Sequence, residues 1–278
     1  MEKSNKTYLH GSIDAWDEVF SGADLSYSES SETQGKLFEH IKISFLKGLF
    51  PPPPAKILEV GCGTAFVSLY FAKRGYAATC LDINEEVLKA AKENFKKEGV
   101  LADFVVGDSE KLSFKDEQFD VVTSFGLLEH FSNPRPTIKE SARVLKSGGL
   151  FFADVVPSRF SCQSFGNIFN ALSSLSYWTL KGKAGLGFKK ALQNFRPLYF
   201  ENNIRFYEYK KMIESAGIKN IQVRGNRPFP RLTLPKSLDR IYTALLKPTR
   251  PVWQAFDRWD SPLPRFWGAG LWFWGIKS

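Results

Sequence analysis

The chain has 278 residues, of which 43% are hydrophobic, and a formal net charge of +9. This length and composition suit one large α/β domain with insertions, or two small domains, and exclude a chain that is disordered throughout. The three cysteines, Cys62, Cys80 and Cys162, show no metal-ligand spacing and are too few for a disulfide framework. We therefore expect no metal site and a reducing compartment.

The N-terminal residues carry no recognisable targeting signal. The first twenty residues lack the apolar core of a signal peptide, and no run reaches the roughly 18 apolar residues that span a bilayer. We expect a cytoplasmic protein.

Charge is unevenly distributed along the chain. Residues 1–154 hold 18 basic and 23 acidic side chains, whereas residues 155–278 hold 20 basic and six acidic ones. The second half also contains Trp253, Trp259, Trp267, Trp272 and Trp274. An acidic first half and a basic, aromatic second half suggest a different partner for each.

Predicted helices and strands alternate over the first 156 residues. Residues 35–49 place apolar side chains four apart, which predicts an amphipathic helix, and the four prolines that follow end it. Strands are predicted at 55–60, 77–83, 102–108, 119–126 and 150–156, and helices at 66–75, 85–98 and 136–145. Asn84 is suited to cap the second of these helices and Gly99 to end it. Short alternating units with continuously apolar strands predict a parallel sheet covered on both faces, which binds ligands at the carboxyl ends of its strands.

The alternation stops after residue 156. Residues 157–200 contain no predicted strand. A helix at 206–217 and a strand at 219–225 follow, and then residues 226–266 carry seven prolines and one predicted helix at 237–246. Residues 270–278 form a predicted last strand.

The glycine turn after the first predicted strand, in ILEVGCGTAF at 57–66, indicates a nucleotide-like ligand. A phosphate-binding loop needs a lysine after the glycines, and none is present. A dinucleotide-binding turn needs a small residue at position 66, where this chain has Phe66. The remaining pattern has an acid, two glycines and a third small residue, which Glu59, Gly61, Gly63 and Ala65 fit.

This segment resembles motif I of the class I S-adenosylmethionine-dependent methyltransferases. The resemblance extends to CLDI, whose acid ends the second strand, to VVGDSEKLSFKDEQFDVVTSFGLLEHFSNP and to ARVLKSGGLFFADVVP. It covers roughly residues 35–156 and is weaker at 203–225 and in the last strand. It implies an α/β, Rossmann-like, doubly wound sheet of seven mostly parallel strands, with an antiparallel last strand and insertions after strands five and six.

The resemblance also implies a domain organisation and a set of cofactor contacts. We expect a helical cap at 1–50, a cofactor-binding core at 51–156, a substrate-side insertion at 157–202, a core helix and strand at 203–225, a basic aromatic insertion at 226–266 and the last strand at 267–278. By the family pattern, Glu59 lies near the cofactor amine, Asp82 accepts from the ribose hydroxyls and Asp108 accepts from the adenine amino group. The remaining contacts form three groups. They are the backbone of the turn at Gly61, Cys62 and Gly63, the neighbours of the adenine at Ile83 and Ser109, and the neighbours of the cofactor's methionine moiety at Ser124, Phe125 and Gly126.

Two positions carry open questions. His130 follows the strand nearest the methyl donor and is the candidate general base, although the family shows the same LEH sequence with unrelated substrates, which favours a structural role. Ala65 stands where the family usually has a third glycine. Alanine is tolerated there if the residue already belongs to the helix, and we expect binding to survive.

The acceptor is predicted from the basic, aromatic regions outside the sheet. A hydrophobic or aromatic small molecule or lipid is favoured, since the core is similar to the quinone-biosynthesis methyltransferases. RNA is the alternative because basic and aromatic residues mix, but no Asn-Pro-Pro-aromatic run follows the fourth strand, so nucleic acid is disfavoured. A non-catalytic binding module is a second alternative, which the intact Glu59, Asp82 and Asp108 set opposes. The basic residues and tryptophans of 226–278 also suggest peripheral contact with an anionic membrane, with core packing of the tryptophans as the rival explanation.

Overall fold

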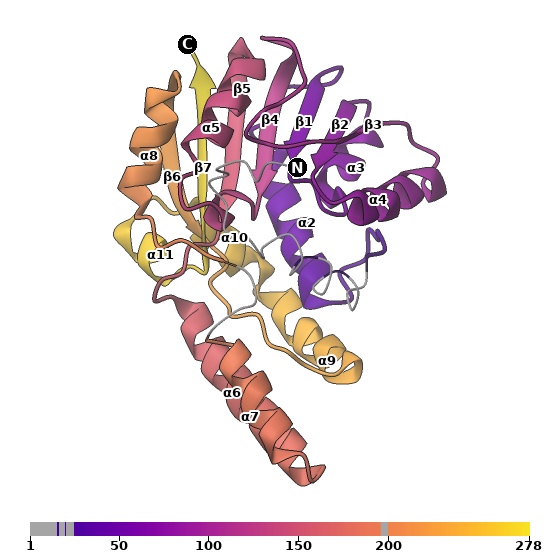
Figure 1. The fold of residues 1–278 in the computed structure, drawn as a ribbon, viewed down its shortest axis with the longest axis vertical. Helices are drawn as coiled ribbons and strands as arrows, with labels where there is room; N and C mark the ends of the chain where they lie inside the picture. Colours follow the sequence, from indigo (N-terminus) through magenta and orange to yellow (C-terminus); the bar gives the residue numbers. More distant parts are fainter. Residues whose placement is uncertain (1–15, 17–19, 21–24, 196–199) are drawn as a thin grey trace, which may run out of the picture.

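A computed structural model describes Trp16, Phe20, residues 25–195 and residues 200–278. Its centre is a seven-stranded sheet with the strand order β3-β2-β1-β4-β5-β7-β6 (Figure 1). The strands are β1 (Lys56–Val60), β2 (Ala77–Asp82), β3 (Asp103–Val106), β4 (Phe119–Phe125), β5 (Leu145–Val155), β6 (Ile218–Asn226) and β7 (Gly270–Lys277). Strand β7 pairs antiparallel with both β5 and β6, and β1 to β5 pair in parallel. The predicted fold class is confirmed.

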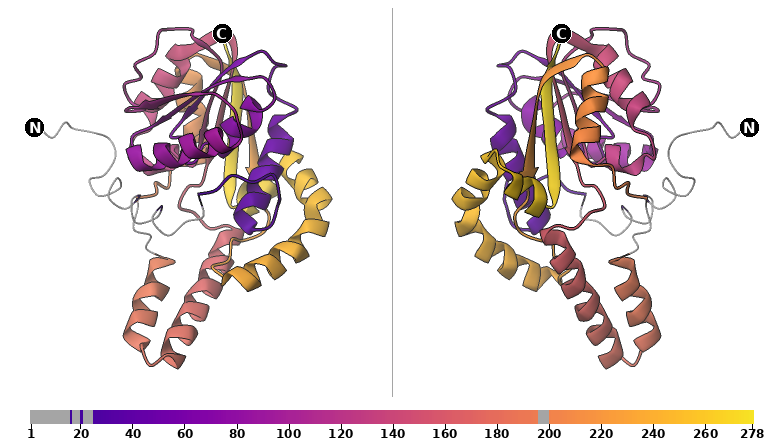
Figure 2. Two further views of the ribbon diagram at one scale, coloured as in Figure 1. Left: turned by 90° about the vertical axis from the view of Figure 1, so that its right-hand side faces the viewer. Right: turned by 90° about the vertical axis from the view of Figure 1, so that its left-hand side faces the viewer.

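Helices cover both faces of this sheet (Figure 2). Helices α5 (Arg135–Val144) and α8 (Phe206–Ser215) pack on one face, and α2 (Gln34–Leu46), α3 (Phe66–Ala72) and α4 (Glu85–Lys97) pack on the other. Successive strand residues point to opposite faces, so Leu58 joins the first cluster and Ile57 the second. Strands buried on both sides explain why the sequence shows continuous apolar runs.

The predicted helix signals act as expected around α4. The side chain of Asn84 accepts hydrogen bonds from the backbone N–H groups of Glu86 and Val87, at 2.9 and 3.1 Å. Gly99 follows the helix with a φ of +67°, a conformation that favours glycine.

The two insertions contain more helix than the sequence predicts. Residues 162–193 form a hairpin of α6 (Cys162–Leu180) and α7 (Ala184–Gln193), where no helix was predicted. The second insertion contains the predicted α9 (Lys236–Leu246) and also α10 (Arg250–Arg258) and α11 (Pro262–Trp267). Short 3₁₀ turns occur at Leu128–His130 and Lys247–Thr249. No helix within the described residues is both long and apolar enough to cross a membrane.

The position of β1 and β4 determines where a ligand can lie. These strands are neighbours at the centre of the sheet, and the chain winds outward from them in opposite directions. The loops after β1 and β4 therefore separate and leave a crevice at their carboxyl ends. The glycine turn and the SFGLLEH segment border this crevice.

Candidate functional site

The turn after β1 holds its backbone against the ends of β2 and β4. Gly61 and Gly63 have φ values of +67° and +52°, in the left-handed region that favours glycine. A Cβ atom on Gly61 would lie 2.8 Å from Cδ1 of Leu127. The N–H of Gly63 donates to the carboxylate of Asp82 at 2.9 Å. Both glycines, together with Cys62 between them, line the cavity described below.

Ala65 does not meet the condition under which alanine costs little at this position. It is not part of α3 but precedes it as the N-cap residue, with a φ of 51° and a ψ of 36°. A left-handed backbone costs about 1–2 kcal/mol for a residue other than glycine. The side chain is fully buried beside Leu69, which offsets roughly 0.8 kcal/mol of that cost.

Glu59 is buried at the end of β1 and lines the cavity. Its Oε2 accepts hydrogen bonds from the hydroxyl and the N–H of Ser68, at 2.5 and 3.1 Å. Burial raises the pKa of Glu59 to about 7, although both bonds from Ser68 act to lower it. The Glu59 carboxyl can therefore lose its proton and become negatively charged when a cationic group of a ligand binds beside it.

Asp82 ends β2 with both carboxylate oxygens facing backbone donors. Its Oδ1 accepts from the N–H of Asn84 at 2.9 Å and its Oδ2 accepts from Gly63. Burial raises the pKa of Asp82, and these N–H groups counteract it. Each oxygen keeps a second lone pair for a ligand hydroxyl. Ile83, the next residue, is 38% exposed and lines the same cavity.

The residues after β3 complete this end of the cavity. Asp108 accepts a hydrogen bond from the N–H of Glu110 at 2.9 Å, and the hydroxyl of Ser109 lies 3.2 Å from that of Thr137. Both residues line the cavity, as do Phe125 and Gly126 after β4. Ser124 is buried within β4 and does not line it, so it is the one predicted cofactor neighbour that the structure leaves aside.

His130 is buried and lines the cavity. Its Nδ1 lies 2.7 Å from the carbonyl oxygen of Phe200. A carbonyl only accepts, so Nδ1 carries the proton of this bond. Burial lowers the pKa of His130, and the ring is therefore neutral near neutral pH. The indole of Trp16 meets this ring edge-on, with 4.8 Å between the centroids.

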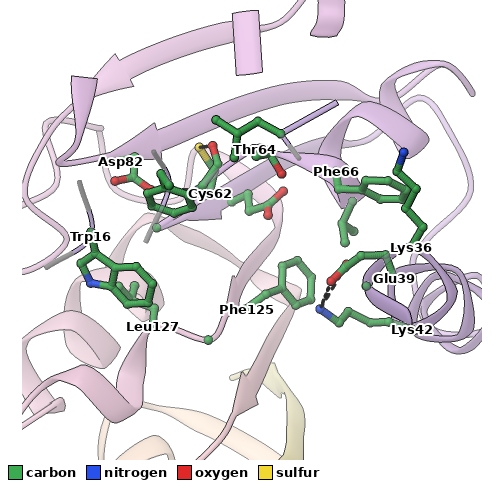
Figure 3. A pocket seen from close by; sticks show the side chains of 18 of the residues that line it. Trp16, Lys36, Glu39, Lys42, Cys62, Thr64, Phe66, Asp82, Phe125 and Leu127 are labelled. Carbon is green, nitrogen blue, oxygen red and sulfur yellow. Dashed lines mark hydrogen bonds and ion pairs between the residues drawn. The ribbon is translucent and has the colours of Figure 1, made fainter. Parts of the chain in front are cut away.

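Apart from Ser124, the predicted cofactor neighbours line one cavity of about 990 Å³ together with His130 (Figure 3). This volume is at the upper end of the range for small-molecule sites, about 300–1,000 Å³. One end is formed by the strand ends just described. The other end is formed by α2, by residues 231–234 and by the start of α9, and includes Lys36, Glu39, Lys42, Arg231 and Arg240.

The sequence did not point to a buried ion-pair network at this second end. Nζ of Lys42 lies 3.2 Å from the carboxylate of Glu39 and 3.4 Å from that of Asp154. The same ammonium lies 4.6 Å from the ring centroid of Phe125, and Figure 3 shows it between Glu39 and that ring. Burial alone would lower the pKa of Lys42, but the two carboxylates outweigh it and the pKa is raised. Lys42 is therefore a buried cation beside Phe125, the residue predicted to border the methionine moiety of the cofactor.

The only sequence signal for Lys42 is its place three residues after Glu39 on a predicted helix. That spacing is common on solvent-exposed helix surfaces. Asp154, at the end of β5, is far away in the sequence, so the pair becomes a site only after folding.

The tryptophans of the second half have mixed positions. Trp253 and Trp272 are fully buried, and Trp253 belongs to a cluster that joins α2, α9 and α10. Trp259 is 52% exposed. Trp274 is half-buried and packs against the core cluster below α2 and α3, so core packing explains three of the five tryptophans after position 200. Within the described residues, no group of three or more histidine, cysteine or acidic side chains could hold a metal ion.

The residues fit S-adenosylmethionine on their own geometry. A close backbone approach at Gly61, a carboxylate with spare lone pairs at Asp82 and a buried, ionisable Glu59 lie along one wall of the cavity. These groups suit a backbone-lined tail, a diol and an amine respectively.

Comparison with known proteins agrees with this fit. A family described as a methyltransferase domain matches residues 58–153. The ubiquinone biosynthesis O-methyltransferase of Xanthomonas axonopodis pv. citri is 30% identical over 130 residues, which are 45% of this chain and 54% of that protein. The ubiquinone/menaquinone biosynthesis C-methyltransferase UbiE of Bartonella quintana is 31% identical over 198 residues, 66% of this chain and 72% of that protein. The chain spans about half the length of the O-methyltransferases that it matches.

A solved structure shares the fold. The YcgJ protein of Bacillus subtilis is 19% identical, with a TM-score of 0.53 over 86% of this chain and 98% of that one. Family match, relatives and site geometry lead to one conclusion: the chain belongs to the class I S-adenosylmethionine-dependent methyltransferases, and S-adenosylmethionine is its cofactor.

Proposed function

We propose that the protein transfers a methyl group from S-adenosylmethionine to a hydrophobic small molecule or lipid that carries a polar ring. The observation that carries this proposal is the single cavity with two chemically different ends. The strand-end wall suits the cofactor, and the α2–α9 end carries cations that face the aromatic side chains of Phe66 and Phe125. Relatives named for ubiquinone biosynthesis support the class of acceptor.

The acceptor end suits a ring with an oxygen substituent. Phe66 and Phe125, which face this end, supply apolar contacts, and the ammonium of Lys42 supplies a buried positive charge. A ring packs against the apolar side chains, while an oxygen that gains negative charge is stabilised by a nearby cation.

The proposed roles divide the chemistry simply. S-adenosylmethionine, when bound, supplies an electrophilic methyl group on a sulfonium. The chain then has to align the acceptor atom with that methyl group and exclude water, because an in-line displacement gains much of its rate from positioning. Lys42 would stabilise the ionised acceptor oxygen, and Glu39 and Asp154 would keep Lys42 charged.

The roles proposed for Lys42 and His130 predict different turnover for variants at the two positions. We expect Lys42→Met to lower kcat by about 100-fold, the cost of removing one stabilising group, without changing cofactor affinity. His130→Ala should retain near-normal turnover, because its ring already bonds the carbonyl of Phe200. Single-turnover assays compare the two, with the melting temperature checking that Lys42→Met is folded. A 100-fold loss in His130→Ala alone would make His130 the base.

Transfer of a tritiated methyl group tests the function. The protein is incubated with labelled cofactor and a prenylated catechol, a simple aromatic catechol or total RNA, and label is counted in the organic and RNA fractions. Transfer to a catechol, abolished by Asp82→Ala, is the expected result. Label in RNA alone supports the alternative activity. Cofactor binding without transfer to any acceptor in an untargeted cell extract would leave the binding-module alternative.

A further inference from the structure

The α6–α7 hairpin extends beyond the rest of the molecule. Figures 1 and 2 show both helices projecting together from the end of the sheet where the parallel strands terminate. Among the residues that the structure describes, the first part of α6 is what joins the hairpin to the core. Gln163 and Asn170 exchange hydrogen bonds with the backbone of residues 231 and 233, and a Cβ on Gly166 would lie 2.7 Å from Cβ of Pro230.

The projecting part exposes large apolar side chains on several sides. Leu172, Leu180, Phe188 and Leu192 are 60%, 89%, 59% and 44% exposed. The two helices pack on each other where Gly187 meets Trp178, so these side chains point away from that contact. Many large apolar side chains exposed on one projecting element indicate an interaction site. A groove on a partner protein would cover the apolar side chains on one face of the hairpin, whereas the acyl chains of a bilayer would cover those on every face.

The charge of the hairpin indicates that this apolar phase is a lipid bilayer with anionic headgroups. Residues 155–200 contain no aspartate or glutamate, and the helices and their connection carry Lys181, Lys183, Lys189 and Lys190. All four lysines are exposed. Lysines can extend toward lipid headgroups while apolar side chains enter the acyl region, and anionic headgroups attract them.

A second element exposes apolar residues at the same end. Leu238, Ile241 and Leu245 lie three and four residues apart on α9 and are 49%, 57% and 68% exposed. Figure 1 shows α9 and the hairpin beyond the same end of the sheet, the end where the parallel strands terminate. The start of α9 also lines the acceptor end of the cavity through Lys236, Asp239 and Arg240.

We propose that the α6–α7 hairpin, together with the outer face of α9, inserts into the interface of an anionic lipid bilayer. The helices lie in the headgroup and upper acyl region without crossing it. This places the mouth of the cavity beside the lipid phase. Lipid binding by the hairpin does not depend on methyl transfer, and only the use of lipid-dissolved acceptors rests on the proposed function.

Vesicle sedimentation tests the proposal. The full chain is mixed with vesicles of phosphatidylcholine alone or of phosphatidylcholine with phosphatidylglycerol, at low and high salt. We compare the wild type with Leu172→Ser/Phe188→Ser, which alters two exposed hairpin residues, and with Leu101→Ser, which alters a 93% exposed leucine in the loop before β3. Circular dichroism and cofactor binding establish that each variant is folded.

We expect the wild type and Leu101→Ser to bind the anionic vesicles and to lose binding at high salt. The double variant should bind at least about tenfold more weakly, because two apolar side chains no longer enter the bilayer. Absence of wild-type binding to anionic vesicles, or equal binding by the double variant, overturns the proposal. It is also overturned if the double variant turns a wild-type dimer into a monomer and neither binds vesicles, since the hairpin is then a self-association surface.

Discussion

Ala65 shows how one residue tolerates an unfavourable backbone conformation. It occupies a left-handed position where glycine would be unstrained, yet its methyl group is fully buried. Replacing it with glycine relieves about 1–2 kcal/mol of backbone strain and loses about 0.8 kcal/mol of burial. We expect Ala65→Gly to stay within about 1 kcal/mol of the wild type in urea unfolding.

Ala91 provides the matched control for that prediction. It is equally buried but lies inside α4, where glycine loses about 1 kcal/mol of helix propensity in addition to the methyl group. Ala91→Gly should therefore lose about 2 kcal/mol. Equal losses at the two sites would contradict the left-handed conformation of Ala65.

Glu59 predicts a pH dependence of cofactor binding. Its pKa is raised to about 7 by burial, so the folded protein holds this proton more tightly than the unfolded chain does. The resulting stabilisation is complete at acid pH and is lost as the pH rises through about 7. If the ionised carboxylate accepts from the cofactor amine, binding below pH 7 must release the proton. Affinity should then fall about tenfold per pH unit below that point.

Calorimetry between pH 5.5 and 7.5 measures this slope of affinity against pH, because that range brackets the Glu59 pKa of about 7. Glu59→Gln should abolish the slope. Glu201→Gln should keep it, because burial and the nearby Glu129 also raise the pKa of Glu201 to about 7 but Glu201 does not line the cavity. A slope that survives in Glu59→Gln assigns the proton to another group.

At this scale the sequence predicts the cofactor wall much better than the acceptor end. Glu59 and Asp82 stand at the ends of β1 and β2 and Asp108 follows β3, each in a short motif that resembles the family's, and this resemblance predicts their place at one sheet edge. Lys42 and Asp154 come from elements that meet only in the folded chain, and neither stands out by residue type or spacing.

The helices also divide into those that the sequence predicts and those that it does not. Core helices such as α4 were predicted because one apolar face packs on the sheet and a capping residue marks the start. Helix α6 has apolar residues on several sides, so no helical period is visible. Helices α10 and α11 begin with prolines in their first turn, where proline is favourable, although a proline-rich segment suggests irregular structure.

Two glycines of α7 test the packing of the hairpin. A Cβ on Gly187 would lie 2.9 Å from Cβ of Trp178, whereas a Cβ on Gly185 meets nothing within 4 Å. Gly187→Ala should therefore overpack the contact and destabilise the hairpin by about 1–3 kcal/mol. Gly185→Ala should strengthen α7, because alanine is the better helix former by about 1 kcal/mol.

Limited proteolysis and hydrogen exchange of the hairpin report both effects. Gly187→Ala should speed cleavage and exchange within α6 and α7, and Gly185→Ala should slow them. Equal behaviour of the two variants would mean that the helices do not pack at Gly187.

For the whole molecule, the uneven charge follows the division between core and insertions. The acidic first half contains the strands and helices that are predicted to bind the cofactor. The basic second half contributes the hairpin, α9 and residues 231–234, which form or flank the end of the cavity proposed to hold the acceptor. Composition therefore predicts that the halves have different partners, but the fold is needed to show that they meet at one cavity.

Titration of S-adenosylmethionine by calorimetry tests the central claim most directly. The wild type is compared with Asp82→Ala and with Asp103→Ala, which removes an equal charge from an exposed residue at the amino end of β3. Loss of two charge-assisted hydrogen bonds should weaken binding by about 2–3 kcal/mol in Asp82→Ala, roughly 30- to 160-fold in Kd, and leave Asp103→Ala unchanged. Equal affinity of a folded Asp82→Ala and the wild type would contradict the placement of the cofactor in this cavity.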